Sequence, residues 1–313
     1  MTAEASTALR FQGVSKRYGR GPRALDQLSF TIPRGTVAGF VGHNGAGKTT
    51  SFAIVSGYLL PDEGEVDILG RGPHDPHALK GLLGVLPQDA ALPERHTPFE
   101  LLVHLGMLQG LAPRRARGEA DRVLGLVQLS DRAKDRIGAL SHGMRRRVAV
   151  ATALCGAPEL VLLDEPLAGL DPMQAHTLRD ALAGLRGKHT LVVSSHNLAE
   201  LERLCDWVVM LKGGRCMREG TMQEVTGQGQ MVRWQLGPGE VPLVPLSLAL
   251  PEHELSLQGR ELVQQAPPGE NLDAATLVVM RHLLEAGVAV RAVSRGMALE
   301  QRFIDDVEQA AGA

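Results

Sequence analysis

The stretch that decides the fold reads Gly42-His43-Asn44-Gly45-Ala46-Gly47-Lys48-Thr49-Thr50. It fits the pattern G-x-x-x-x-G-K-[ST] and lies between an apolar strand, Val37 to Val41, and a predicted helix, Lys48 to Tyr58. Glycines let successive backbone N–H groups point at phosphate oxygens, and the start of a helix adds positive charge. The alternative is a glycine-rich turn without a ligand, and the strand and helix on either side disfavour it.

This loop predicts a nucleotide site with a defined set of contributors. Lys48 is expected to reach the outer phosphates, and Thr49 is expected to ligate Mg²⁺. The residues predicted to hold the nucleotide are Gly42, Asn44, Gly45, Ala46, Gly47, Lys48, Thr49 and Thr50.

A second apolar strand, Leu160 to Leu163, ends in the carboxylates Asp164 and Glu165. We expect Asp164 to hold Mg²⁺ and Glu165 to act on the attacking water as a general base or polarising group. Apolar runs often end in acids that only cap the next element, so this pair has little weight alone. Its weight comes from the phosphate loop upstream.

From Leu9 to Gly220 the chain resembles the ABC ATPases, and the segment Leu140-Ser141-His142-Gly143-Met144 carries this resemblance most specifically. It stands where that family has its Leu-Ser-Gly-Gly-Gln signature. The resemblance implies that Ser141, His142 and Gly143 contact ATP held by a facing cassette. His142 departs from the usual glycine. If that position needs a positive φ, histidine is one of the less unfavourable residues there, and altered kinetics rather than inactivity would follow.

Further matches to the family occur in the expected order. The resemblance assigns Gln88 to a loop that senses Mg²⁺ and water, and the segment 168–171 to the dimer interface. It makes His196 the switch histidine near the γ-phosphate and Tyr18 the aromatic that stacks on adenine. A lone Gln or His at a strand end is usually a polar cap, and a lone exposed Tyr is usually only surface, so the ordered set carries the assignment.

Ser141 is predicted to be the N-cap of a helix from Met144 to Leu154. Arg145, Arg146 and Arg147 follow in its first turn, where cations oppose the helix dipole. An arriving anion, such as a partner's ATP, would explain them. A solvated basic face is the equal alternative.

Composition narrows the function classes. The 313 residues have a formal net charge of -2 and 3% aromatic residues, which disfavours a nucleic-acid partner. The three cysteines show no metal or redox spacing, so we expect a reducing cytoplasm. We find no secretory signal, and the apolar segment 241–250 is too short to span a membrane and contains two prolines. Any membrane-spanning partner is therefore expected to be another chain.

The pattern of elements predicts an α/β fold: a phosphate-loop NTPase core with a mostly parallel sheet, an antiparallel β subdomain, a helical signature subdomain and a small α+β C-terminal module. Strands are predicted at 9–14, 28–32, 37–41, 65–69, 160–163, 191–194 and 208–211. We expect the ATPase domain at 1–222, with the helical subdomain at about 89–158, and an accessory domain at 223–313 that follows a linker at 227–230.

The resemblance implies an ATP-hydrolysing subunit that dimerises on ATP and drives a separate membrane permease from the cytoplasmic face of the inner membrane. The run 144–147 and the C-terminal extension are typical of bacterial export systems for drugs, lipids or polysaccharides. The alternative is a related ATPase acting on a ribosomal or nucleic-acid partner. A phosphate-loop kinase or GTPase is disfavoured, because no Asn-Lys-x-Asp base-reading set is present.

Overall fold

The computed structural model describes residues 6–267 and 270–312. The chain divides into two compact units, Met1–Gly220 and Thr221–Ala313. Each unit has its own hydrophobic core, and each is described by itself below.

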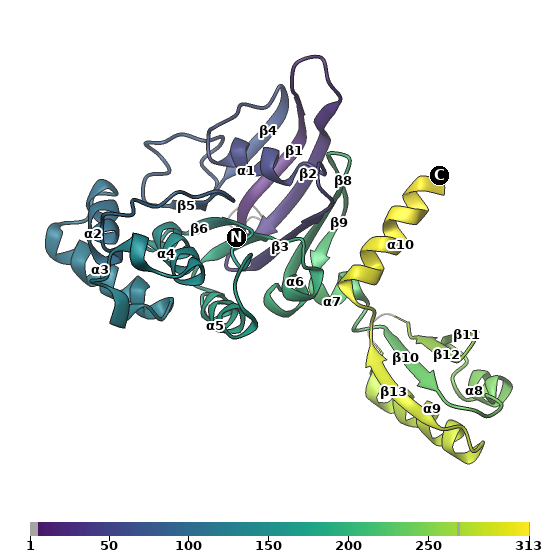
Figure 1. The fold of residues 1–313 in the computed structure, drawn as a ribbon. Helices are drawn as coiled ribbons and strands as arrows, with labels where there is room; N and C mark the ends of the chain where they lie inside the picture. Colours follow the sequence, from purple (N-terminus) through teal and green to yellow (C-terminus); the bar gives the residue numbers. More distant parts are fainter. Residues whose placement is uncertain (1–5, 268–269, 313) are drawn as a thin grey trace. The chain divides into compact units, whose positions relative to one another are not determined.

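The first unit is built on a six-stranded sheet in the order β5-β6-β7-β3-β8-β9 (Figure 1). Its strands are β3 (Val37–Gly42), β5 (Leu83–Leu86), β6 (Leu160–Asp164), β7 (Thr190–Ser194), β8 (Trp207–Lys212) and β9 (Arg215–Thr221). The pairs β5-β6, β6-β7, β7-β3 and β3-β8 are parallel. Strands β6 and β7 are buried at every residue, as expected for a sheet covered on both faces. Because these strands are parallel, their carboxyl ends share one edge of the sheet.

An antiparallel sheet in the order β2-β1-β4 packs on this core. It consists of β1 (Thr7–Arg17), β2 (Arg23–Pro33) and β4 (Glu63–Ile68). A row of rings connects Phe11 and Phe30 in this sheet to Phe40 on β3 and Phe52 on the following helix, with centroid separations of 4.6, 5.3 and 5.7 Å. This row fixes the strand before the phosphate loop and the helix after it to one core.

Helices α1 (Lys48–Val55), α5 (Pro172–Ala183) and α6 (Leu198–Leu204) accompany the sheet. Helices α2 (Pro98–Leu108), α3 (Pro113–Leu126) and α4 (His142–Leu154) gather beside β5 and β6 (Figure 1). The residues Thr97-Pro98-Phe99-Glu100 mark the start of α2. Thr97 and Glu100 form a full capping box, and Pro98 is the first helical residue.

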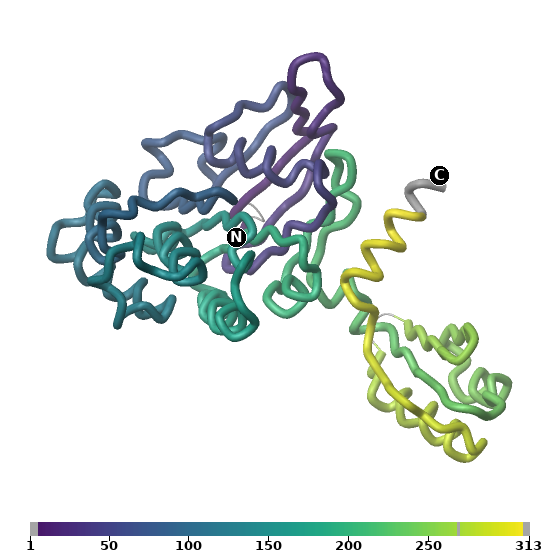
Figure 2. The backbone as a smooth tube through the Cα atoms, in the orientation of Figure 1, coloured from purple at the N-terminus to yellow at the C-terminus, as the bar shows by residue number. Residues whose placement is uncertain are grey.

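The second unit is a four-stranded antiparallel sheet with helices. Its elements are α7 (Met222–Thr226), β10 (Met231–Leu236), α8 (Leu243–Ala249), β11 (Glu254–Gln258), β12 (Glu261–Gln265), α9 (Leu272–Glu285), β13 (Val290–Arg295) and α10 (Leu299–Gly312). Helix α9 runs along the sheet (Figures 1 and 2). The core forms around Trp234, which is fully buried.

One sequence expectation changes. The segment 227–230 is a turn that ends α7, with Gly227 at φ 70°, and the division between the units lies before α7. The apolar segment 241–250 contains α8, and Pro245 is tolerated because it lies in the first turn, where the helix needs no N–H from it. Among the described residues, no helix combines the length and apolar character needed to cross a membrane.

Candidate active site

The phosphate loop joins β3 to α1, and two of its glycines, Gly42 and Gly47, are sterically required. A Cβ on Gly42 would lie 2.7 Å from the Cβ of Ala46 and 2.8 Å from the carbonyl oxygen of Leu211. Gly47 has a φ of 110° and precedes the first residue of α1. No side chain caps this helix and no acid lies in its first turn, so its N–H groups and positive end are available to an anion.

Lys48 is held by the loop itself. Its Nζ donates to the carbonyl oxygens of Gly42 (2.5 Å) and His43 (3.2 Å). Burial lowers the pKa of Lys48, and the negative charges of Glu165 and Asp164 oppose that shift. The ammonium therefore lies between the loop and the two carboxylates.

The end of β6 places the two acids differently. Asp164 is 5% exposed, and its Oδ1 accepts a short hydrogen bond from the hydroxyl of Ser194 on β7. The amide of Glu165 donates to the Ser194 hydroxyl (3.0 Å) and carbonyl oxygen (3.2 Å). Glu165 has a φ of 52°, a left-handed conformation that is uncommon outside glycine and is often found at functional sites. Its Oε2 lies 2.9 Å from Nδ1 of His196, which follows β7.

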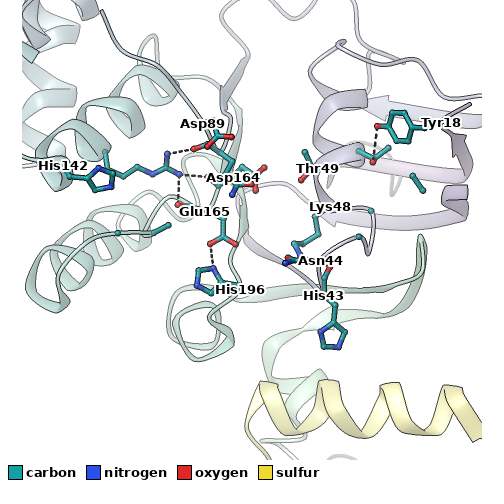
Figure 3. A pocket seen from close by; sticks show the side chains of 18 residues that line it. Tyr18, His43, Asn44, Lys48, Thr49, Asp89, His142, Asp164, Glu165 and His196 are labelled. Carbon is teal, nitrogen blue, oxygen red and sulfur yellow. Dashed lines mark hydrogen bonds and ion pairs between the residues drawn. The ribbon is translucent and has the colours of Figure 1, made fainter. Parts of the chain in front are cut away.

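These groups face one cleft of about 1000 Å³ (Figure 3). Figure 3 shows Lys48 and Thr49 on one side, opposite Asp164, Glu165 and His196. Twelve of the residues predicted for the site line this cleft: Tyr18, Asn44, Gly45, Gly47, Lys48, Thr49, Thr50, Gln88, His142, Asp164, Glu165 and His196. Tyr18 is half exposed, and its hydroxyl lies 3.3 Å from Oγ1 of Thr50.

Four predicted residues do not line the cleft: Gly42, Ala46, Ser141 and Gly143. Gly42 ends β3, and Ala46 is buried beneath the loop. Ser141 caps α4 as predicted, and its Oγ accepts from the amide of Met144 at 3.2 Å. Gly143 packs against α5, where a Cβ would lie 2.0 Å from Oε1 of Gln174.

His142 needs no left-handed backbone. It is the first residue of α4 and is not among the residues with positive φ, so the condition for a backbone cost is not met. Its imidazole packs on Gly169, where a Cβ would lie 2.7 Å from Nε2. The side chain that replaces the family's usual glycine therefore contacts the loop after Glu165 in its own chain.

The three arginines of α4 all bind carbonyl oxygens of their own chain. Arg145 donates to Leu140 (3.0 Å), and Arg147, which is 8% exposed, donates to Val127 (3.1 Å). Arg146 reaches the cleft, with donors on the carbonyl oxygens of Gln88, Asp164 and Glu165. These bonds explain the arginines without an arriving anion, and they contradict a solvated basic face.

Four residues that line the cleft were not predicted for it: Ala24, His43, Asp89 and Arg146. Ala168 and Gly169 also line it, and the resemblance had assigned them to the dimer interface instead. Adjacency was an available signal for some of them, since His43 lies inside the phosphate loop and Asp89 follows Gln88. No sequence pattern indicated that Arg146 turns into the cleft, because its acceptors lie 18 to 58 residues away.

Comparison with known proteins decides the family. The family described as "ABC transporter" matches residues 25–168. The daunorubicin resistance ATP-binding protein DrrA3 of Streptomyces coeruleorubidus is 34% identical over 306 residues, which cover 97% of this chain and 95% of the relative. This chain is an ATP-binding subunit of the ABC transporter family.

Other relatives of this ABC subunit agree. The Nod factor export ATP-binding protein I of Mesorhizobium japonicum is 32% identical, over 96% of this chain and 86% of that protein. A dimeric ATP-binding cassette solved in a post-hydrolysis state with ADP and Pi has a TM-score of 0.62 at 25% identity, over 68% of this chain and 98% of that one. CbiO1 of Clostridium perfringens, described as part of the ABC transporter complex CbiONQ, has a TM-score of 0.65 at 26% identity, over 79% and 96%.

These relatives confirm the predicted family, the fold class and the activity of an ATPase subunit. The subunit binds ATP as its nucleotide. The roles of individual residues remain predictions. The positions of these residues in the cleft define what each role would require.

Proposed function

We propose that this subunit hydrolyses MgATP to drive export through a separate membrane-spanning subunit. The observation that carries the proposal is the cleft itself, where the phosphate loop faces the Glu165–His196 pair. The names of the relatives, daunorubicin resistance and Nod factor export, support export over import.

Within the cleft each group has a distinct task. The loop amides and the start of α1 bind the phosphates, and Lys48 neutralises the outer ones. Glu165 polarises the attacking water, and His196, 2.9 Å from Oε2, orients that carboxylate and reaches the γ-phosphate. Tyr18, at the rim beside Thr50, stacks on adenine.

The oxygen donors of the cleft fit Mg²⁺. The Thr49 hydroxyl, the Asp164 carboxylate and the Gln88 side-chain carbonyl are hard oxygen ligands of the kind this ion prefers. Bound there, Mg²⁺ would neutralise charge that develops on the phosphates. The Ser194 hydroxyl keeps the Asp164 carboxylate in place for it.

A second cassette completes the site in this proposal. Ser141 and Gly143 do not line the cleft of their own chain. Ser141 caps the N-terminus of α4, whose positive end could bind an anion held by another chain. The solved relative with ADP and Pi is dimeric. A symmetric pair would place Ser141 to Gly143 of each chain on the ATP of the other.

The permease is proposed to dock on a groove of about 340 Å³ between the end of α1 and α2. Tyr58 (80% exposed), Leu108 (73% exposed) and Lys80 are among the residues that line it. Such large exposed apolar side chains around a groove suit an apolar helix of a membrane protein. In this proposal the subunit lies at the cytoplasmic face of the cell membrane. Phe99 and Leu101, on the same helix α2, are half buried and do not line the groove.

Substituting Glu165→Gln tests the catalytic proposal. ATP hydrolysis should fall by about 100-fold or more, because general bases contribute roughly 10²- to 10⁴-fold. ATP binding should persist, and the variant should dimerise with ATP and Mg²⁺ in light scattering. The control is Glu159→Gln, which removes only a surface ion pair with Arg34 and should hydrolyse ATP normally. Full activity of Glu165→Gln would refute the assignment.

Copurification from detergent-solubilised membranes tests the export partner. We expect a multi-span membrane protein with the wild-type chain and much less with Leu108→Glu. The control Leu248→Glu changes an equally exposed leucine on α8 and should retain the partner. Loss with both variants, or with neither, would contradict docking on the groove. RNA or DNA stimulation of the ATPase activity would instead favour the ribosomal or nucleic-acid alternative.

A further inference from the structure

Arg146 lines the cleft and connects three parts of the first unit. It lies in the first half of α4, and its Nη1 donates to the carbonyl oxygen of Gln88 at 3.0 Å. Its Nη2 donates to the carbonyl oxygens of Asp164 at 2.7 Å and Glu165 at 2.6 Å (Figure 3). One planar guanidinium thus joins the α4 helix to the loop after β5 and to the end of β6.

The neighbouring arginines show that this connection is particular to Arg146. Arg145 binds the carbonyl oxygen of Leu140, one turn away on its own segment. Arg147 binds Val127 and Gln128, at the end of α3. Neither of these two lines the cleft, whereas Arg146 does. The chain therefore offers consecutive arginines of which only one bonds to the predicted catalytic residues.

The hydrogen bond from Arg146 to Glu165 is made to a residue whose backbone has an unfavourable conformation. Glu165 has a φ of 52°, and such conformations persist when surrounding groups hold them. Ser194 holds the amide of Glu165, and Arg146 holds its carbonyl oxygen. The peptide groups on both sides of the Glu165 Cα are therefore fixed, which sets the direction of its side chain toward His196.

The positive charge of Arg146 strengthens its hydrogen bonds to the carbonyl oxygens. Burial lowers the pKa of its guanidinium, while the negative charges of Asp164, Glu165 and Asp89 oppose that shift. The guanidinium keeps its charge, since arginine does not deprotonate in proteins. Charged donors make shorter and stronger hydrogen bonds to carbonyl oxygens than neutral donors do.

We infer that Arg146 is a positioning residue for ATP hydrolysis. It holds Glu165 and the Gln88 loop in a fixed relation through their backbone carbonyl groups, without contact to the reacting phosphate. Movement of the Gln88 loop, which follows β5, is thereby transmitted to the backbone of Glu165. The inference rests on the proposed role of Glu165 as the group that acts on water.

The test compares the purified full-length variants Arg146→Ala, Arg146→Lys and Arg145→Ala. Arg146→Ala should lower kcat by about 10- to 100-fold, since displacement of a catalytic group by about 1 Å has effects of that size. Its KM for ATP should stay within about twofold, because the loop that binds the phosphates is intact. Arg146→Lys should recover part of kcat, because an ammonium can bind one or two of the carbonyl oxygens but lacks the planar fork. Arg145→Ala should have the kcat of the wild type. Millimolar guanidinium ion should raise the kcat of Arg146→Ala and leave the kcat of Arg145→Ala unchanged.

Several outcomes would overturn the inference. Wild-type kcat in Arg146→Ala would do so, as would equal losses in Arg146→Ala and Arg145→Ala. In a third outcome, both Arg146 variants lose thermal stability in parallel with kcat, and guanidinium does not raise kcat. This result would mean that Arg146 only stabilises the fold. Far-UV circular dichroism shows whether Arg146→Ala is folded. If it is not, the kcat of Arg146→Lys is compared with the kcat of the wild type and of Arg145→Ala instead. Full activity of Glu165→Gln would refute the proposed catalytic role instead, so the two failures are distinguishable.

Discussion

Gly143 illustrates at the scale of one residue how the signature packs on helix α5. A Cβ there would lie 2.0 Å from Oε1 and 3.0 Å from Cδ of Gln174, so the end of that side chain would have to move. We expect Gly143→Ala to lower the free energy of unfolding by about 1 kcal/mol, the low end of the range for overpacking, because the obstacle is the end of a flexible side chain and not backbone. Urea denaturation measures this change.

Shortening the opposing side chain supplies the control. The Oε1 of Gln174 is buried without a hydrogen-bond partner among the described residues, so removing it gives up no bond there. The double variant Gly143→Ala with Gln174→Ala should recover most of the stability lost by Gly143→Ala alone, as a coupled pair does. Additive losses in the double variant would show that the clash with Gln174 is not the cause.

Residue identity alone predicted much of the cleft, but not the contacts that position it. The phosphate loop was readable because its chemistry is local, within nine consecutive residues. The bonds of Arg146 were not, because they depend on β5 and β6 lying side by side under α4. The left-handed Glu165 was equally invisible, since glutamate has no preference for that conformation.

At the scale of elements, the capping boxes make a local prediction about α2. The Thr97 hydroxyl accepts from the amide of Glu100 at 3.1 Å, and the Glu100 carboxylate accepts from the amide of Thr97 at 2.9 Å. Thr97→Ala should lower the stability of the first unit by about 1 kcal/mol, as loss of an N-cap typically does. Thr221 and Glu224 form the same box at the start of α7, so Thr221→Ala is a matched substitution in the second unit.

Elements with strong local signals were predicted best. The start of α2 can be read from the sequence, because a capping box and a proline mark it. Helix α8 was not predicted. The prolines at 242 and 245 were counted only against a membrane span, and Pro245 lies in the first turn of α8, where a helix tolerates proline. Strand β11 is mostly exposed and lies at the sheet edge, so it carries little hydrophobic pattern.

At the scale of the whole molecule, the two units should unfold as separate cooperative bodies. Their cores share no residue, and the sequence has two tryptophans, one in each unit. Trp207 packs against the first core, and Trp234 is fully buried in the second. Trp234→Phe therefore leaves a fluorescence reporter for the first unit, and Trp207→Phe leaves one for the second. Thr97→Ala should shift only the Trp207 transition, and Thr221→Ala only the Trp234 transition.

ATP gives this prediction its sharpest test, because every residue that lines the cleft lies in the first unit. A ligand that binds only the folded state stabilises it by RT ln(1 + [L]/Kd), about 2.7 kcal/mol at 100 times Kd. In a Glu165→Gln background, which should prevent hydrolysis during the measurement, MgATP should raise the free energy of unfolding that Trp207 reports by at least that amount and leave the value that Trp234 reports unchanged. If MgATP raises both free energies equally, the two units unfold as one body. The second unit would then be linked energetically to the nucleotide, as a regulatory domain requires.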